Sequence, residues 1–458
     1  MLNVIPIRKG HTISLKGAAE KILSRLPPPA SYALKPGDFP HLTPRLLVGE
    51  GDRVLAGAPL FVDKYRPAIR YASPVSGTVS AIVRGDRRRL LSVIVTPSYE
   101  QEYVQRPVAD LSALAREEVV ALLLESGAWP FIRQRPFGTV ADPADYPKAI
   151  FISGFDTAPL APDADFTLTG ETLAFQKGID VLHKLADRLY LGLHDEMGAT
   201  SILQHIKGVE KKIFRGPHPS GNVGVQIHHI SPLNKGEKVW TVDPQHIVSL
   251  GRLFLQGVYD VSKVIALTGS EVKRPRYFRM RSGASLSTIA GYVHTAGRRR
   301  YISGNVLTGT NVGPDGHLGF YDNAITVIPE GDQYEFLGWA NPLRLHRYSV
   351  SRSYLSWMFP HRKYALDANI NGGERAFVLT GLYEKVLPMD ILPVYLLKAI
   401  LAGDVDKMEQ LGIYEVIEED LALCEFVCPS KIPVQAILRK GIALMLNEEQ
   451  EAIPLTTR

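Results

Sequence analysis

Three large aromatic residues and two arginines lie together in one short stretch of this chain. The aromatic residues are Trp129, Phe131 and Phe137, and the arginines are Arg133 and Arg135. Flat apolar side chains can contact a redox ring such as a quinone, and a guanidinium stabilises the negative charge that builds on its oxygens during reduction. Aromatic side chains beside arginines are also common where domains pack together. The stretch is therefore our candidate for a quinone contact, with domain packing as the alternative.

A lysine nearer the N-terminus could instead hold a covalently bound group. Lys64 follows Asp63 and lies between Gly51–Leu60 and Ser73–Val79, two β-type runs punctuated by Gly and Pro. These runs resemble strands of the barrel-sandwich fold of lipoyl and biotinyl carrier domains, where the modified lysine lies in an Asp-Lys pair at a hairpin tip. The sequence Tyr65-Arg66-Pro67 differs from the small residues of carriers. We expect an unmodified barrel, with a non-catalytic carrier or adaptor module as the alternative.

The chain offers few ligands for a metal. Cys424 and Cys428 are the only cysteines, and their spacing places them on one face of a helix. An iron–sulfur cluster needs about four ligands, so this pair could bind a metal only with ligands from outside the chain. His228 and His229 are adjacent, and on a strand they would point to opposite faces. We expect no metal site and structural roles for these residues.

A glycine-rich loop from Gly216 to Gly224 includes His218. It lacks the Lys-Ser/Thr pair of a phosphate-binding Walker loop, and its glycines do not fit the G-x-G-x-x-G pattern. The sequence therefore names no catalytic residue and predicts no cofactor tightly bound to this chain.

The composition of the 458 residues, 45% apolar and 22% charged, is typical of a soluble globular protein. No uninterrupted apolar run approaches the roughly 18 residues of a membrane-spanning helix. The first residues lack the apolar core of a signal peptide. Two cysteines exclude a disulfide framework and suit a reducing compartment. We expect a cytoplasmic location.

The net charge of +5 is gathered in clusters at Arg87–Arg89, Lys273–Arg281 and Arg298–Arg300. Such clusters bind phosphates or the acidic groups of a partner subunit. No zinc-finger spacing, RNA-binding aromatic signature or recognition helix accompanies them. We expect protein partners and no nucleic acid.

The spacing of apolar residues predicts the elements that position these groups. Helices are expected at 111–126, 170–193, 246–257, 391–401, 406–411, 418–427 and 434–446. Strands are expected at 148–154, 264–267, 288–293 and 324–328. The pattern indicates an α+β chain of several domains. They are an N-terminal segment (1–29), a barrel-sandwich domain (30–104), an α/β domain (105–260), a second β-rich domain (261–340) and a C-terminal helical domain (341–458).

A series of long motifs runs in order along nearly the whole chain. They are Arg133–Phe137, Val209-Glu210, Gly216–Gly221, Val239–Thr241, Ala266–Gly269, Ile302–Gly304, Ala324–Gly331, Glu335–Trp339, Asn371–Arg375 and Cys424–Pro429. Together they resemble the A subunit of the sodium-translocating NADH:quinone reductases. That family is related to the flavin-binding subunit of complex I and to the C subunit of the Rnf complex.

The resemblance implies a Rossmann-like α/β domain, a β-grasp-like (SLBB) domain and a C-terminal helical bundle. It also implies a peripheral subunit on the cytoplasmic side of the bacterial inner membrane, in a complex that oxidises NADH, reduces quinone and exports Na⁺. Partner subunits B to F would hold FAD, FMN, riboflavin and a 2Fe-2S centre, and this subunit would contribute to quinone binding or reduction. No complete active site is expected in the isolated chain. Without a spanning segment it cannot move Na⁺ alone, so it must dock on membrane partners.

Overall fold

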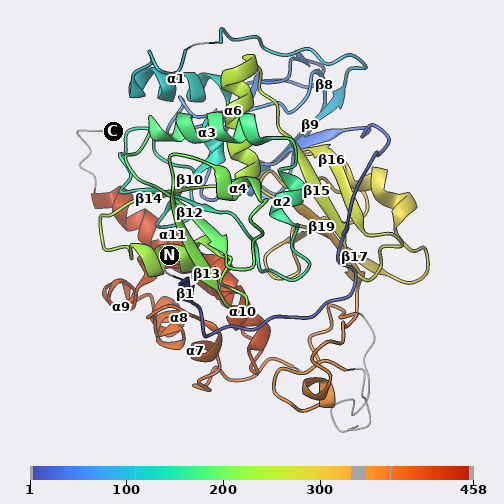
Figure 1. The fold of residues 1–458 in the computed structure, drawn as a ribbon, viewed down its shortest axis with the longest axis vertical. Helices are drawn as coiled ribbons and strands as arrows, with labels where there is room; N and C mark the ends of the chain where they lie inside the picture. Colours follow the sequence, from blue (N-terminus) through green and yellow to red (C-terminus); the bar gives the residue numbers. More distant parts are fainter. Residues whose placement is uncertain (1–3, 109, 332–346, 372, 453–458) are drawn as a thin grey trace.

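The computed structural model describes residues 4–108, 110–331, 347–371 and 373–452. The motif Glu335–Trp339, residue 372 of the motif Asn371–Arg375, and the expected boundary at 340/341 lie outside the described residues. The described residues form two six-stranded sheets, a pair of smaller sheets and a group of C-terminal helices (Figure 1). No helix within these ranges is long and apolar enough to cross a membrane.

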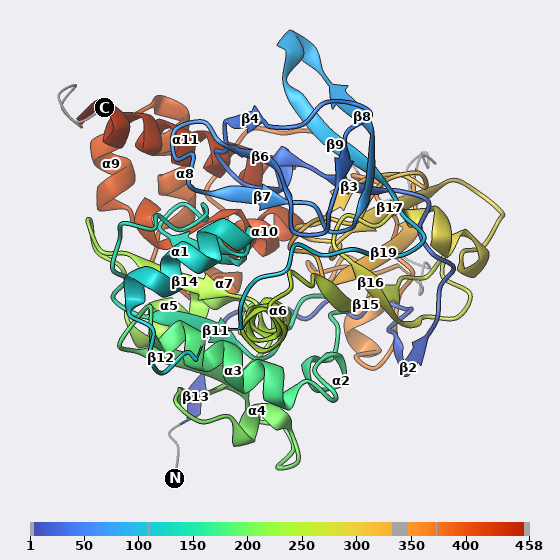
Figure 2. The ribbon, with the colours of Figure 1, turned by 90° about the horizontal axis from the view of Figure 1, so that it is seen from above.

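The two smaller sheets form the N-terminal barrel. Their strands are β3 (Tyr32–Leu34), β4 (Pro44–Leu46), β5 (Arg53–Val54), β6 (Pro59–Asp63), β7 (Arg70–Ala72), β8 (Gly77–Arg84) and β9 (Leu90–Pro97). The antiparallel orders are β3-β9-β8-β5 and β4-β6-β7, with strands at both predicted runs. Gly77 permits the close pairing of β8 with β9, because a Cβ there would lie 2.0 Å from the carbonyl oxygen of Thr96. The β8–β9 hairpin projects from the molecule (Figure 2).

The first six-stranded sheet has the order β1-β13-β12-β11-β14-β10 and is parallel except for β10. Its strands are β1 (Val4–Pro6), β10 (Ile132–Arg135), β11 (Ile150–Ser153), β12 (Leu189–His194), β13 (Glu210–Arg215) and β14 (Val239–Val242). The helices of this part of the chain are α1 (Arg116–Ser126), α2 (Ala164–Thr167), α3 (Thr172–His183), α4 (Ile202–His205), α5 (Val223–Ile230) and α6 (Pro244–Gln256), of which α6 follows the last strand.

The helix predicted over 170–193 is wrong in its second half. Helix α3 ends at His183, and Leu189–His194 forms strand β12. Strand β12 lies between β11 and β13, and Leu189 to Leu193 are all buried. A strand buried on both faces has a continuous apolar run, which periodicity alone does not separate from a buried helix.

Helices α3 and α6 pack closely against each other at two glycines (Figure 2). A Cβ atom at Gly251 of α6 would lie 1.7 Å from the carbonyl oxygen of Ala174, and one at Gly178 of α3 would lie 2.1 Å from that of Ile247. Neither position has room for a larger residue while the helices keep this separation.

The second six-stranded sheet is mixed and has the order β18-β17-β19-β15-β16-β2. Its strands are β2 (Glu20–Ser24), β15 (Ser262–Thr268), β16 (Arg276–Arg281), β17 (Arg299–Ser303), β18 (Thr310–Asn311) and β19 (Ala324–Pro329). The strand predicted at 288–293 is wrong, because Leu286–Tyr292 forms a 3₁₀ helix. The side chain of Ser285 caps this helix by accepting a hydrogen bond from the backbone N–H of Ser287. Strands β1 and β2 show that the N-terminal segment supplies an edge strand to each large sheet.

Helices were expected at four places in the C-terminal part, and all four are present. The helices there are α7 (Tyr383–Val386), α8 (Pro393–Ala402), α9 (Val405–Gln410), α10 (Glu418–Val427) and α11 (Val434–Ala452). Helix α11 packs against α8 and α10 around an apolar core that includes Leu396, Leu421 and Leu438.

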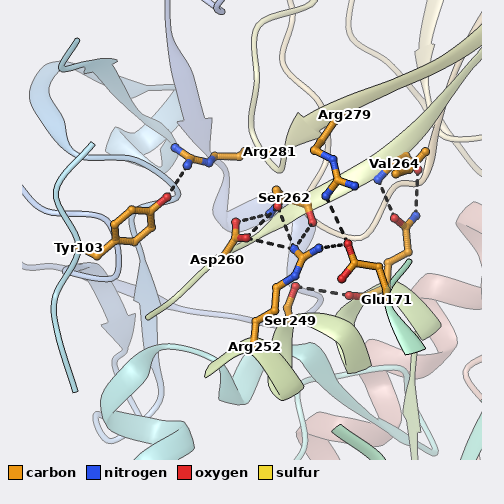
Figure 3. Close-up of polar contacts among 10 residues, drawn as sticks. Tyr103, Glu171, Ser249, Arg252, Asp260, Ser262, Val264, Arg279 and Arg281 are labelled. Atoms are coloured by element: carbon orange, nitrogen blue, oxygen red, sulfur yellow. Dashed lines mark hydrogen bonds and ion pairs between the residues drawn. The ribbon is translucent and has the colours of Figure 1, made fainter. Parts of the chain in front are cut away.

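An ionic network joins helices α3 and α6 to the second six-stranded sheet (Figure 3). Arg252 of α6 contacts Asp260 at 3.1 Å and Glu171 at 2.5 Å. Glu171 also pairs with Arg279 of β16 at 3.4 Å, and Arg281 of the same strand donates to the hydroxyl of Tyr103. Buried or half-buried charges held by several partners fix the orientation of the elements that bear them. The network therefore holds α6 at a defined position relative to the second sheet.

Candidate functional site

A cavity of about 200 Å³ lies at the carboxyl ends of the neighbouring parallel strands β11 and β14. After β11 the chain forms β12 and then β13 on one side of β11 in the sheet. It then returns through α5 to form β14 on the other side of β11. The strand order therefore reverses between β11 and β14. Open α/β sheets bind their ligands at such a switch point, outside the carboxyl ends of the strands.

Several parts of the chain build the wall of this cavity. Ser153 ends β11, Asn222 is the N-cap of α5 and Asp243 is the N-cap of α6. The second sheet contributes Asn323, whose side-chain amide donates to Asp243 at 2.7 Å. Helix α10 contributes Glu419, whose backbone carbonyl accepts a hydrogen bond from the side chain of Asn222 at 3.0 Å. The cavity thus lies where both large sheets and the C-terminal helices meet.

Acidic groups outnumber basic ones around the cavity. Asp156, Asp243 and Glu419 line it, and Arg133 is the basic side chain that faces them. This balance disfavours a ligand with phosphate groups, because carboxylates repel phosphates at short range. Phe155, Val242 and Leu307 supply apolar wall. The wall of the cavity therefore combines carboxylates, one guanidinium and apolar side chains.

Two titratable groups next to the cavity have shifted pKa values. Desolvation by the protein packed around the cavity raises the pKa of the Asp156 carboxyl to about 6, although the residue is partly exposed to solvent and its Oδ1 accepts a hydrogen bond from the N–H of Ala158 at 2.7 Å. Burial lowers the pKa of His218 to about 4, so its imidazole is neutral at pH 7. The hydroxyl of Thr157 contacts Nδ1 of His218 at 3.2 Å and accepts from the N–H of Gly221 at 2.9 Å. These contacts tie the glycine-rich loop to the loop that follows β11.

We expect the change Asp156→Asn to remove a pH dependence of stability. A carboxyl with a raised pKa holds its proton more tightly in the folded protein, so the wild type loses stability as the pH rises from about 4 to about 6. Asp156 is exposed to solvent at the cavity, and solvent screens its charge, which limits the gain of the variant above pH 6 to about 1 kcal/mol. Urea unfolding midpoints at two pH values, below and above this range, measure it. An equal difference from wild type at both pH values would contradict the expectation.

The structure brings one of the five candidate residues directly to the cavity. Arg133 lies on β10, half-buried, with its guanidinium carbon 4.8 Å from the centre of the Tyr321 ring. Its backbone pairs with Thr241 of β14, which also lines the cavity. The hydroxyl of Tyr321 donates to the carbonyl of Pro130 at 2.6 Å, which fixes the ring under the guanidinium.

Two of the candidate aromatic residues are fully enclosed by protein. Trp129 donates its indole N–H to the carbonyl of Ala141 at 2.8 Å and contacts Trp240 edge to face. Phe131 is stacked on His246, with ring centres 4.7 Å apart. Neither side chain lines the cavity, and both lie in the 3₁₀ turn Trp129–Phe131 that directly precedes β10.

Arg135 and Phe137 contact the C-terminal helices. Arg135 is 2% exposed and binds Asp420 at 2.6 Å and Glu419 at 2.5 Å. Burial disfavours the charge of Arg135, but the two carboxylates outweigh burial and raise its pKa. The ring of Phe137 packs beside that of Tyr414. Because Glu419 also lines the cavity, Arg135 sets the position of one wall residue.

The other chemistry-bearing residues lie in structural contacts. His228 and His229 are on helix α5, so the strand assumed for them was wrong. Nε2 of His228 accepts a hydrogen bond from the backbone N–H of Asp390, which leaves Nδ1 to donate to the carboxylate of Glu415 at 2.7 Å. Cys424 lies in α10 and Cys428 caps it, both as buried free thiols. Burial raises the pKa of the Cys424 thiol. Within the described ranges, no three His, Cys, Asp or Glu residues are grouped to hold a metal ion.

Lys64 lies at the turn between β6 and β7 and is exposed. This is the hairpin position expected for a carrier lysine. Asp63 is buried and accepts hydrogen bonds from the N–H of Tyr65 and the side chain of Arg66, both at 3.0 Å. Its carboxylate stabilises the turn, and the carrier hypothesis for Lys64 stays a prediction.

Sequence reasoning missed most of the residues that line the cavity. Asp156, Asn305, Asn323 and Glu419 come from four segments far apart in the chain. One signal was available, because the strand predicted at 148–154 runs into a loop and ligands bind after such strands. Of these four residues, that rule points to Asp156 alone.

The combination of barrel, α/β domain and second β-rich domain is found in a known class of chains. Three family models match: "NqrA N-terminal barrel-sandwich hybrid domain" at residues 5–98, "NqrA second alpha/beta domain" at 114–259 and "NQRA C-terminal domain", of SLBB type, at 264–313. These matches confirm the expected barrel-sandwich, α/β and SLBB domains in their order.

Curated relatives match the chain over nearly its whole length. The A subunit of the Na(+)-translocating NADH-quinone reductase of Serratia proteamaculans is 38% identical over 450 residues, which cover 97% of this chain and 100% of that one. The corresponding A subunits of Pseudomonas aeruginosa and Rhodopirellula baltica are each 37% identical and cover 97% of this chain. The chain belongs to the family of A subunits of the Na⁺-translocating NADH-quinone reductases, as its motifs predicted.

Among solved structures, an NAD⁺-reducing [NiFe]-hydrogenase in the air-oxidized state matches with a TM-score of 0.36 and 11% identity. The match covers 74% of this chain and 65% of that chain, which is less than two thirds. A similarity this low has no bearing on function.

Proposed function

We propose that this chain is the peripheral, cytoplasmic-side A subunit of a Na⁺-exporting NADH:quinone reductase, and that its switch-point cavity binds the quinone ring. The quinone takes up two electrons and two protons to become quinol. Subunits B to F, with their flavins and 2Fe-2S centre, supply the electrons from NADH, and water supplies the protons. The family membership and the cavity at the carboxyl ends of β11 and β14 together support this proposal.

Arg133 is the residue that would contact the quinone. Its guanidinium lies over Tyr321 at the edge of the cavity and would stabilise negative charge on a quinone oxygen during reduction. Trp129 and Phe131 would support β10 from behind, whereas Arg135 and Phe137 would hold β10 against the C-terminal helices. These four are positioning residues in the proposal.

We expect Arg133→Gln to lower photolabelling of the cavity by a quinone analogue at least about tenfold. The change removes the guanidinium that lies over Tyr321 at the cavity, and charge-assisted contacts are about twice as strong as neutral ones. The assembled complex is labelled with an azidoquinone that has no tail, and labelled peptides are identified by mass spectrometry. Arg45→Gln, at an exposed strand position outside the cavity, is the matched control. Labels that avoid every cavity residue in the wild-type complex would contradict the proposal.

The finer description of the domains belongs to the same proposal. We interpret the α/β domain as Rossmann-like, the second β-rich domain as β-grasp-like and the C-terminal helices as a bundle, within the boundaries given above. The membrane subunits would be contacted through the exposed arginines at the tip of the β8–β9 hairpin and through the C-terminal helices.

A further inference from the structure

A second, larger cavity of about 550 Å³ lies beside the first. Asp156, Ala158 and His218 line both cavities, so these three residues form the junction between them. The remaining wall of the second cavity is mixed: its apolar part includes the buried residues Ile13 and Leu15 together with Leu160, and its polar part includes Thr12, Ser14 and Lys363.

The N-terminal segment and residues 360–364 build the far wall of the second cavity together. The N–H of Tyr364 donates to the carbonyl of Ser14 at 2.9 Å, and the N–H of Lys16 donates to the carbonyl of Tyr364 at 2.9 Å. On the inner side, the N–H of His11 donates to the carbonyl of His218 at 2.8 Å. Backbone hydrogen bonds on both sides hold the segment in place, so this cavity has a built wall.

An exposed apolar segment directly precedes, along the chain, three residues that line the second cavity. Pro360, His361 and Lys363 line the cavity and are exposed, and they follow directly after Trp357, Met358 and Phe359. Trp357 and Met358 are each 54% exposed, and Phe359 is 43% exposed. These residues lie in the orange segment at the lower end of the molecule in Figure 1. Exposed large apolar side chains grouped in this way indicate a contact with an apolar partner.

We propose that the second cavity binds the isoprenoid tail of the quinone whose ring occupies the first cavity. This inference rests on the proposed function. The tail would enter over Trp357 and Phe359, lie along Ile13 and Leu15, and leave the ring beyond the junction at Asp156 and His218. An acyclic hydrocarbon chain fits the apolar part of this wall, because each buried methylene gains free energy by leaving water and needs no polar partner.

The test compares two photoreactive analogues that share a ring and differ in the tail. One has no tail and the other has about four isoprene units, enough to add several buried methylenes. Each analogue is titrated against three complexes, which contain the wild-type chain, the Ala161→Trp variant or the Ala113→Trp variant. Ala161 lines the second cavity and not the first, so a tryptophan there fills only the proposed tail site. Ala113 is exposed and lines neither cavity, so it is the matched control.

We expect the wild type to be labelled by the tailed analogue at about tenfold lower concentration than by the tailless one. Ala161→Trp should abolish that preference without changing labelling by the tailless analogue, and Ala113→Trp should preserve it. If the wild type shows no preference for the tail, or Ala161→Trp retains it, the tail site is wrong while ring binding stands. If the tailless analogue does not label the first cavity at all, both the proposed function and the tail site are wrong.

Discussion

Replacing Asp420 with alanine should lower the free energy needed to separate α10 from the first large sheet by about 3–5 kcal/mol. The carboxylate of Asp420 is fully buried and lies 2.6 Å from Arg135, which is 2% exposed. Its Oδ2 also accepts a hydrogen bond from the N–H of Ile417 at 3.0 Å, which caps α10. Without this carboxylate a buried guanidinium keeps only Glu419, and the first turn of α10 loses its cap.

Amide hydrogen exchange in α10 and β10 measures this loss, because it reports the free energy of local opening in a chain with several domains. Glu419→Ala is the matched control: it removes the neighbouring carboxylate from the same arginine, but that side chain is 29% exposed. We expect the control to cost less than half as much as Asp420→Ala. Equal losses in the two variants would mean that burial of the ion pair does not determine its contribution.

The second large effect is expected at Gly251, where alanine should destabilise the protein by about 3 kcal/mol. Helix propensity alone predicts the opposite sign, since alanine is favoured over glycine inside a helix by about 1 kcal/mol. The added Cβ would lie 1.7 Å from the carbonyl oxygen of Ala174, so α3 and α6 must move apart. A backbone atom cannot rotate away as a side chain can.

The free energy of unfolding from urea titration, followed by circular dichroism, measures the effect of Gly251→Ala. Gly291→Ala is the matched control, because a Cβ at Gly291 meets no atom within 4 Å. Surface changes of this kind stay within about 0.5 kcal/mol. A Gly251→Ala variant as stable as wild type would show that the two helices can separate at little cost.

The sequence predicted the parts of the fold that depend on local patterns. Helices α10 and α11 have a regular apolar period and were placed within a few residues, apart from the end of α11. The predictions failed at 189–194 and 288–293. In the first case a strand buried on both faces lacks alternation. In the second, the capping hydroxyl of Ser285 favours a 3₁₀ turn over the extended backbone that Thr288, Ile289 and Val293 suggest.

Of the five residues proposed from the sequence, Arg133 alone lines the cavity, for a physical reason. The sequence shows which residue types are close together along the chain, and for that reason the residues of Trp129–Phe137 were proposed as one site. The cavity instead collects residues that tertiary packing brings together, such as Asp156 from the loop after β11 and Glu419 from α10. Their side chains become neighbours only once both large sheets and the C-terminal helices have assembled.

The two N-terminal edge strands impose an order on biosynthesis. Val4–Pro6 pairs with Ile213–Arg215, and Glu20–Ser24 pairs with Arg276–Phe278. During translation the first residues to leave the ribosome must therefore wait until nearly half of the polypeptide or more has emerged before they can pair. A tag or an extension at the amino end would therefore be attached to strands that are still unpaired during this part of translation. Unpaired strand edges are prone to aggregation.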